Sequence, residues 1–192
     1  MLDVPLEVPL AAAEDAELLV LGARGDGGFP DLRVGSTALH AAARAGCPTV
    51  VLPAEPLGPG AREHVVVGVD ARRPAEAALA FAFGAARRYG LPLRAVHAFP
   101  GRARRQAAAG YRADEAALLA RVLEPWAAAH PDVEVVPDTE PAGAGMLLVE
   151  ASSKARLLVV GRHPVTPAGR LGPVAHAVLH HAGCPVAVVP GF

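Results

Sequence analysis

Short apolar runs alternate along this chain with longer, alanine-rich stretches, and the alternation predicts its secondary structure. Residues 64–70 (HVVVGVD) form an apolar run bounded by polar residues, which is typical of a strand buried on both faces. Pro74 then opens a helix of sequence AEAALAFAFGAARRY, and Gly90 ends it. The same patterns predict further strands at 91–98, 133–136, 157–161 and 186–189, and helices at 113–129, 145–152 and 174–182.

Strands that alternate with helices indicate βαβ units and therefore a parallel sheet. We expect an α/β fold over residues 64–192, with a doubly wound, Rossmann-like sheet of five parallel strands. Ligands of such sheets bind beyond the carboxyl ends of the strands, where the strand order reverses. This rule indicates Asp70, after the first of these strands, and Gly161, at the end of the fourth.

The last part of this pattern occurs twice. Residues 16–22 (AELLVLG) return as 155–161 (ARLLVVG), and residues 35–53 (GSTALHAAARAGCPTVVLP) return as 172–190 (GPVAHAVLHHAGCPVAVVP). Because an internal repeat sets the architecture, each copy is expected to build its own sheet. We predict a truncated C-terminal half domain at 1–53, a Pro- and Gly-rich linker at 54–63 and a complete domain at 64–192.

The truncated copy leaves the strand at Leu18–Leu21 without the neighbour that the complete copy encodes. An open apolar edge invites pairing with another chain, so we expect a homo-oligomer or a tandem pseudo-dimer, and a protein partner is a further expectation. Residues 2–10 alternate between apolar and polar or proline positions, as a substitute edge strand would. A frayed terminus, or a start that is not the natural one, is the alternative.

A glycine-containing loop follows the strand of the first copy. Gly22 and Gly25 let the backbone turn and approach an anion closely. Gly35 and Ser36 open a helix whose free N–H groups and positive dipole end face the same point, and Thr37 adds a second hydroxyl. This G-x2-G-x9-G-S spacing predicts a site for a di- or triphosphate.

The corresponding loop of the second copy is two residues shorter and eroded. It keeps Gly161 and Gly172, but Pro164 stands where the second glycine belongs and Pro173 replaces the serine. Two donors are lost, because proline has neither an N–H nor a hydroxyl. The side chains that could compensate with positive charge are Arg162, His163 and Arg170.

The loop, the GVD ending at residues 68–70 and the AGCPVAVVP ending at 182–190 together resemble the universal stress protein family over nearly the whole chain. The resemblance implies a five-stranded, adenine nucleotide alpha-hydrolase-like fold, dimerisation through the last strands and a role in the stress response. In family members that bind ATP, the acidic residue after the first strand lies near the ribose and adenine, a place that the resemblance gives to Asp70. ATP is therefore the ligand that the resemblance implies, and weak or absent nucleotide binding is the other expectation. A scaffold that no longer binds nucleotide and acts through dimerisation or partner contacts is the alternative.

Composition narrows the function classes. A net charge of −1 provides no steering toward nucleic acid or acidic lipid, and the apolar runs are too short to span a membrane. The cationic residues Arg102, Arg104 and Arg105 therefore predict a solvated loop. Cys47 and Cys184 are repeat equivalents that we interpret as small buried residues, and we expect a cytoplasmic protein with neither a nucleic-acid nor a membrane partner.

Three further candidates do not predict a catalytic or metal site. Ser152 and Ser153 have no partnered base, so we expect no enzyme, although weak nucleotide hydrolysis stays open. His176 and His180 have the i, i+4 spacing of zinc ligands but lack an HExxH glutamate, which favours a solvated helix face. Asp70 itself has two interpretations that stay open, a ligand-binding residue or a cap of the following helix.

Overall fold

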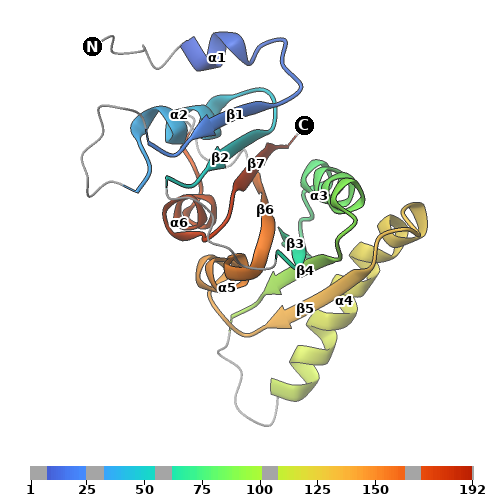
Figure 1. Ribbon diagram of the computed structural model, residues 1–192. Coiled ribbons are helices and arrows are strands. Elements are labelled where there is room, and N and C mark those ends of the chain that lie inside the picture. The colour runs from blue at the N-terminus through green and yellow to red at the C-terminus, as the bar shows by residue number, and fades with distance from the viewer. Residues whose placement is uncertain (1–7, 25–32, 55–61, 101–107, 163–169, 192) are drawn as a thin grey trace.

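A computed structural model describes residues 8–24, 33–54, 62–100, 108–162 and 170–191. Seven strands in these ranges form one sheet in the order β1-β2-β7-β6-β3-β4-β5 (Figure 1). All neighbouring strands are parallel except β2 and β7, which are antiparallel. The strands are β1 (Leu19–Gly22), β2 (Thr49–Leu52), β3 (His64–Gly68), β4 (Leu93–Ala98), β5 (Val135–Glu140), β6 (Ala155–Arg162) and β7 (Val186–Pro190).

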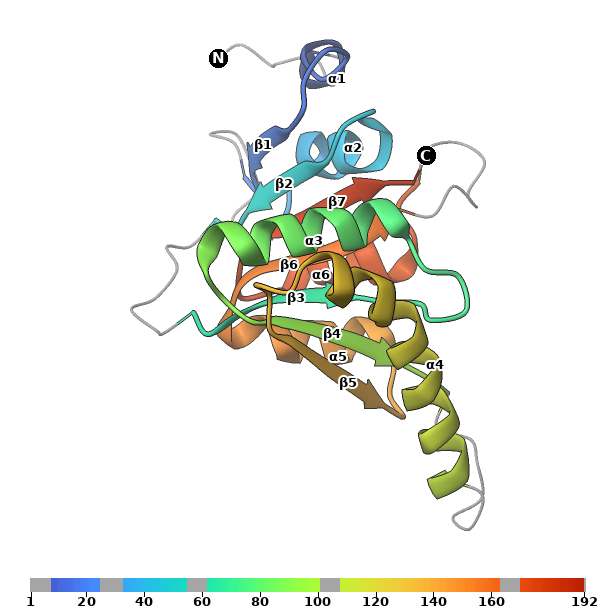
Figure 2. The ribbon, with the colours of Figure 1, turned by 90° about the vertical axis from the view of Figure 1, so that its right-hand side faces the viewer.

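Helices cover both faces of the sheet and form a three-layer fold (Figure 2). Helices α3 and α4 enclose one apolar core with Phe83 and Leu119, and helices α2, α5 and α6 enclose the other with Leu148 and Val178. The helices are α1 (Val8–Ala12), α2 (Ser36–Arg44), α3 (Glu76–Tyr89), α4 (Ala108–Ala129), α5 (Ala144–Ala151) and α6 (Pro173–His181), and a 3-10 turn follows α5 at Ser152–Lys154.

The predicted elements of residues 64–192 are present, and the α/β class with a mostly parallel sheet is confirmed. Helix α3 ends at Gly90, as predicted. That residue has a left-handed φ of 62°, which glycine adopts without steric cost, and its N–H donates to the carbonyl groups of Ala86 and Arg87. Two boundaries differ most: β5 lies at Val135–Glu140 and not at 133–136, and α4 begins at Ala108 and not at residue 113.

The expectation of a separate sheet for each copy is wrong. The last strand of the first copy, β2, pairs with the last strand of the second, β7, and places Val50 opposite Ala187 and Thr49 opposite Val188. Each of these strands would otherwise leave an apolar edge open, and the pairing removes both edges. The five strands of the second copy are thus continuous with β2 and β1 in one seven-stranded sheet. The division into 1–53, 54–63 and 64–192 stays a prediction.

Residues 8–10 begin helix α1, so the substitute edge strand considered for residues 2–10 is not formed there. Alanine-rich sequence favours a helix, and residues 11–13 are all alanine. The cluster of Ala13, Ala45 and Cys47 includes Leu10 and Leu19, so α1 packs beside the end of α2. Residues 2–7 of that strand lie outside the described ranges.

Candidate functional site

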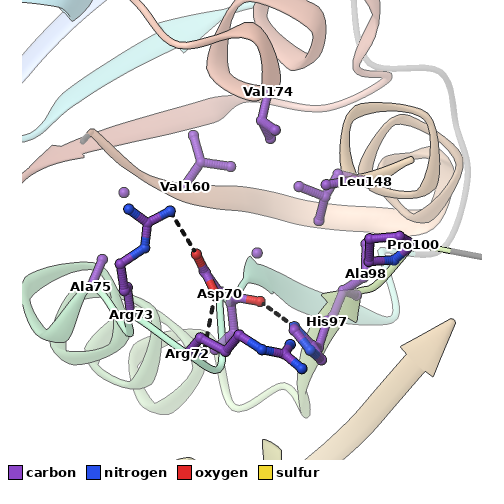
Figure 3. A pocket seen from close by; sticks show the side chains of 15 residues that line it. Asp70, Arg72, Arg73, Ala75, His97, Ala98, Pro100, Leu148, Val160 and Val174 are labelled. Carbon is purple, nitrogen blue, oxygen red and sulfur yellow. Dashed lines mark hydrogen bonds and ion pairs between the residues drawn. The ribbon is translucent and has the colours of Figure 1, made fainter. Parts of the chain in front are cut away.

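A cleft of about 350 Å³ lies beyond the carboxyl ends of β3, β4 and β6. This is the place where ligands bind in open α/β sheets. Figure 3 shows Asp70 and Arg73 on one side of the cleft, with Leu148, Val160 and Val174 across from them. The lining residues are Gly68, Val69, Asp70, Arg72, Arg73, Ala75, Val96, His97, Ala98, Pro100, Ala144, Leu148, Val160, Gly161 and Val174.

The carboxylate of Asp70 faces this cleft and also orders the turn between β3 and α3. Its Oδ1 accepts a hydrogen bond from the backbone N–H of Arg72 at 3.1 Å, and its Oδ2 lies 3.6 Å from Nη2 of Arg73. The residue that caps α3 is Ala75, not Asp70, so the helix-cap interpretation of Asp70 is wrong. With a side chain that is 39% exposed, Asp70 can accept a hydrogen bond from a ligand hydroxyl.

A polar cluster with a buried centre lies beside the same turn, and we name it the Glu115 cluster: the buried Glu115 and His97 with the half-exposed Arg72. Glu115 is 1% exposed and His97 is 2% exposed. The His97 Nε2 lies 3.0 Å from Oε2 of Glu115, and its Nδ1 lies 3.0 Å from the carbonyl oxygen of Val69. Arg72 donates to both carboxylate oxygens of Glu115, to Oε2 at 2.8 Å.

The Glu115 cluster is strongly coupled electrostatically. Hydrogen bonds from Arg72 lower the pKa of Glu115 to about 2, despite the opposing effect of burial, and the same pair raises the pKa of Arg72. Sequence reasoning missed this cluster. The available signal was Glu115 itself, which stands at helical spacing with Leu118, Leu119 and Val122 on the apolar stripe of α4. A carboxylate on such a stripe requires a buried partner.

Gly161 lies in the cleft wall and also allows β6 to pass the start of α3. A Cβ at this position would lie 2.5 Å from the Cβ of Ala75, closer than van der Waals packing allows. Gly172 is the N-cap of α6, two residues before Val174 of the cleft wall. Pro173 is the first residue of that helix and provides no N–H there.

A backbone hydrogen bond joins the two ends of the first-copy loop. Gly22 ends β1, and the N–H of Gly35, the N-cap of α2, donates to the carbonyl of Ala23 at 2.7 Å. Ser36 is exposed in the first turn of α2, and Thr37 follows it. Gly25 lies outside the described residues.

The structure does not bring the first-copy loop together with Asp70 and Gly161. Strand β1 is parallel to β2, β2 is antiparallel to β7, and β7 is parallel to β6. The carboxyl ends of β1 and β6 therefore point in opposite directions along the strands. One end of the strands therefore carries Gly22, Gly35 and Ser36, and the opposite end carries Asp70 and Gly161.

The residues that we expected to compensate for the lost donors lie in different surroundings. Arg162 is turned toward the first copy, where its Nη1 donates to the carbonyl of Ala42 in α2 at 3.3 Å. Its partial burial lowers its pKa. Arg170 is exposed just before α6, and His163 and Pro164 lie outside the described residues. The predicted solvated loop with Arg102, Arg104 and Arg105 lies outside them too.

The remaining candidates are consistent with structural roles. The rings of His176 and His180 lie 4.5 Å apart, but the described ranges contain no group of three or more His, Cys, Asp or Glu side chains able to hold a metal. Cys47 and Cys184 are buried and free, and burial raises the pKa of Cys184 to about 12. Within the described segments no helix is long and apolar enough to cross a membrane.

Comparison with known proteins supports the fold and indicates the family. The model of the universal stress protein family matches residues 5–53 and 61–190. The chain belongs to the universal stress protein family. Universal stress protein Rv2005c of Mycobacterium tuberculosis (strain ATCC 25618 / H37Rv) is 34% identical over 201 residues, covering 96% of this chain and 65% of that protein. Rv2624c of the same strain is 30% identical over 184 residues, covering 95% of this chain and 65% of its own length. This universal stress protein thus spans 65% of the length of these curated relatives.

Solved structures show the same architecture. A putative universal stress protein from Pseudomonas aeruginosa UCBPP-PA14 has a TM-score of 0.69 at 16% identity, covering 98% of this chain and 69% of that one. A universal stress protein in complex with cAMP has a TM-score of 0.52 at 27% identity, covering 69% of this chain and 100% of that one. The first similarity shows the fold, and the second comes from a protein that holds a nucleotide.

Proposed function

We propose that this universal stress protein is a regulatory protein of the stress response that binds an adenine nucleotide in the cleft beyond β3, β4 and β6. The observation that carries the proposal is the pairing of Asp70 and Gly161 with an apolar wall in one cleft. Further support comes from the relative in complex with cAMP, which is matched over 69% of this chain.

The cleft offers different chemistry to each part of a nucleotide. The apolar wall of Leu148, Val160 and Val174 suits the faces of a base. Asp70 can accept hydrogen bonds from ribose hydroxyls, which would replace the weak 3.6 Å contact of its carboxylate with Arg73. Arg73, whose side chain is 70% exposed, can then face a phosphate group.

The phosphate end of the site is the weak part. Pro173 removes an N–H from the first turn of α6, and Arg162 donates to Ala42 instead of facing the cleft. We therefore expect the affinity to rise little from AMP to ATP, since added phosphates meet few donors. ATP, the ligand expected from the family resemblance, is retained as a candidate together with cAMP and AMP.

We propose that the protein binds the nucleotide and does not hydrolyse it. The lining groups that could act as a base are both engaged, Asp70 by the turn that it orders and His97 by Glu115 and Val69. A bound nucleotide would then change how the protein contacts a partner, and we propose that this occurs in the cytoplasm.

A scaffold without nucleotide binding is the second candidate. The observation that favours it is the loss of donors at the start of α6, where Pro173 follows Gly172. In this case the cleft would be a remnant and the protein would act through its surfaces alone.

Calorimetric titration with cAMP, AMP and ATP tests the first candidate. We expect heat of binding for the unmodified protein, and Asp70→Ala should weaken the affinity by about tenfold to a hundredfold, the value of hydrogen bonds to a charged group. Asp114→Ala, an exposed carboxylate on α4 outside the cleft, is the matched control and should leave the affinity unchanged.

Two results would contradict the proposal. No heat and no shift in melting temperature with any of the three nucleotides would favour the scaffold. Binding that Gly35→Pro abolishes and Asp70→Ala does not would move the site to the first-copy loop.

A further inference from the structure

Apolar side chains of the first copy are exposed at positions where the second copy buries their equivalents. By the internal repeat, β1, β2 and α2 correspond to β6, β7 and α6. In the second copy, Leu157, Val159 and Val189 are 5%, 0% and 2% exposed. Their equivalents in the first copy, Leu18, Val20 and Leu52, are 44%, 51% and 42% exposed, and we name these three residues the open face.

The difference in exposure arises from a neighbouring strand and a covering helix that only the second copy has among the described residues. In the second copy, β3 pairs with the outer edge of β6, and α3 packs over β6 and β7. In the first copy, among the described strands, β1 pairs only with β2 and forms the end of the sheet. The described part of the first copy thus has neither a strand at the edge of β1 nor a helix over the open face.

The open face is continuous with an existing core. Val20 pairs with Val50 and Gly22 with Leu52, so these residues lie on one face of the sheet. Val50 packs against the core that α3 covers, as does Phe81 of α3 itself. A second helix laid over β1 and β2 would extend that core beyond Phe81.

We propose that the open face and the free edge of β1 bind a strand followed by a helix from a separate polypeptide, the N-terminal half of another universal-stress-type domain. The strand would lie parallel to β1, as β3 lies along β6, where Val67 pairs with Val159. The helix would cover Val20 and Leu52 with small and aromatic side chains, as Ala82 and Phe83 of α3 do for the second copy.

The chemistry of the surface favours this partner over a second copy of the chain. Two β1 strands paired across a two-fold axis would satisfy both edges but leave both open faces exposed. The other end of the sheet is poorly suited to pair with β1, because β5 contains Pro137, which cannot donate a backbone hydrogen bond. Only a unit with both a strand and a helix covers the edge and the face together.

Co-expression tests the proposal with a defined probe. The full chain is expressed together with a tagged segment of residues 62–141, which contains the strand–helix unit that covers the second copy. We expect the two to copurify in a 1:1 ratio, and the backbone amides of β1 to exchange with solvent at least about tenfold more slowly than in the full chain alone.

Two sets of variants of the full chain locate the contact. Val20→Asp with Leu52→Asp should abolish copurification without lowering the melting temperature, because both side chains are exposed. Val136→Asp is the matched control, since Val136 is a 41% exposed residue of β5 at the opposite end of the sheet. It should leave copurification unchanged.

Three results would overturn the proposal. Copurification that survives the double variant would show that the segment pairs elsewhere, for example by replacing β3. A folded full chain that never retains the segment would show that the open face does not bind such a unit. A full chain that is already a dimer, with β1 protected from exchange and the dimer lost in the double variant, would assign the surface to a second copy.

Discussion

Gly161 serves two purposes at one position. It contributes to the wall of the cleft, and its missing side chain lets β6 approach Ala75 at the start of α3. We predict that Gly161→Ala lowers the free energy of unfolding by about 1–3 kcal/mol, the usual effect of overpacking a core, as measured by urea denaturation. Gly84→Ala is the control: this residue lies inside α3 with open space around it, so its free energy of unfolding should rise by about 0.5–1 kcal/mol. A change of the same sign in both variants would show that the close approach is not what requires Gly161.

The Glu115 carboxylate should give the protein a defined acid sensitivity. Its pKa is about 2 in the folded protein against a reference value of 4.5, so Glu115 contributes stability above the reference value. That contribution is lost as the pH falls from about 4.5 toward 2. We predict that Glu115→Gln lowers the free energy of unfolding by about 2 kcal/mol at pH 7 and flattens its dependence on pH within that window. Thermal melts at pH values from 7 down to 2.5 measure both effects.

Glu140→Gln is the matched control for Glu115→Gln. Glu140 also pairs with an arginine, Arg112, but both side chains are exposed, and such pairs contribute little to stability. An equal loss in the two variants would argue that burial of the Glu115 cluster has no special effect.

The site could be predicted from the sequence only in part. Asp70 and Gly161 were found because each follows an apolar run, and the ends of parallel strands meet at one edge of the sheet. The Glu115 cluster was not, because its members come from the β3–α3 turn, from β4 and from α4. The local sequence of each element does not indicate that these three distant segments meet in the fold.

At the scale of elements, Arg162 connects the second copy to the first. Its Nη1 donates to the carbonyl of Ala42 in the last turn of α2, a contact between residues 120 positions apart. We predict that Arg162→Met weakens the docking of α2 by about 1–2 kcal/mol, the value of a hydrogen bond to a charged group. Faster amide exchange in α2, with exchange in α3 unchanged, is the measurement.

Arg156→Met provides the comparison for Arg162→Met. Arg156 lies on the same strand, but its guanidinium stacks over the ring of Tyr89 at 5.2 Å and does not reach the first copy. Exchange in α2 should not respond to it. If both variants accelerate exchange in α2 equally, the effect comes from β6 in general and not from the contact with Ala42.

The elements themselves were predictable to different degrees. Buried strands such as β3 and β6 are short apolar runs, and α3 has a clear end signal at Gly90, so local sequence was sufficient. Residues 2–10 alternate as an edge strand would, and this interpretation competes with the alanines after them, which favour the helix that forms as α1. The local pattern of β2 and β7 does not indicate their pairing, because an apolar strand shows that it needs a neighbour but not which one; only the family resemblance implied a contact through the last strands.

At the scale of the whole molecule, the cores on both sides of the sheet extend across the β2–β7 pairing. Val51 of β2 and Val186 of β7 belong to the same cluster, and Val50 packs against the other cluster. We predict a single cooperative unfolding transition, in which the fluorescence of Trp126, the one tryptophan of the chain, and the far-UV circular dichroism change together in urea. A loss of circular dichroism that precedes the fluorescence change would show that the first copy unfolds by itself.

The β2–β7 pairing does not depend on protein concentration, because both strands belong to one polypeptide. Two separate subunits joined through such strands would part on dilution, whereas strands tethered in one polypeptide stay together at any concentration. Tethering has an evolutionary consequence as well. A mutation in a symmetric dimer alters both ends at once, but here each end can change alone. The two copies differ in this way, with a glycine-rich sequence after Gly22 in the first and a proline-containing start of α6 in the second.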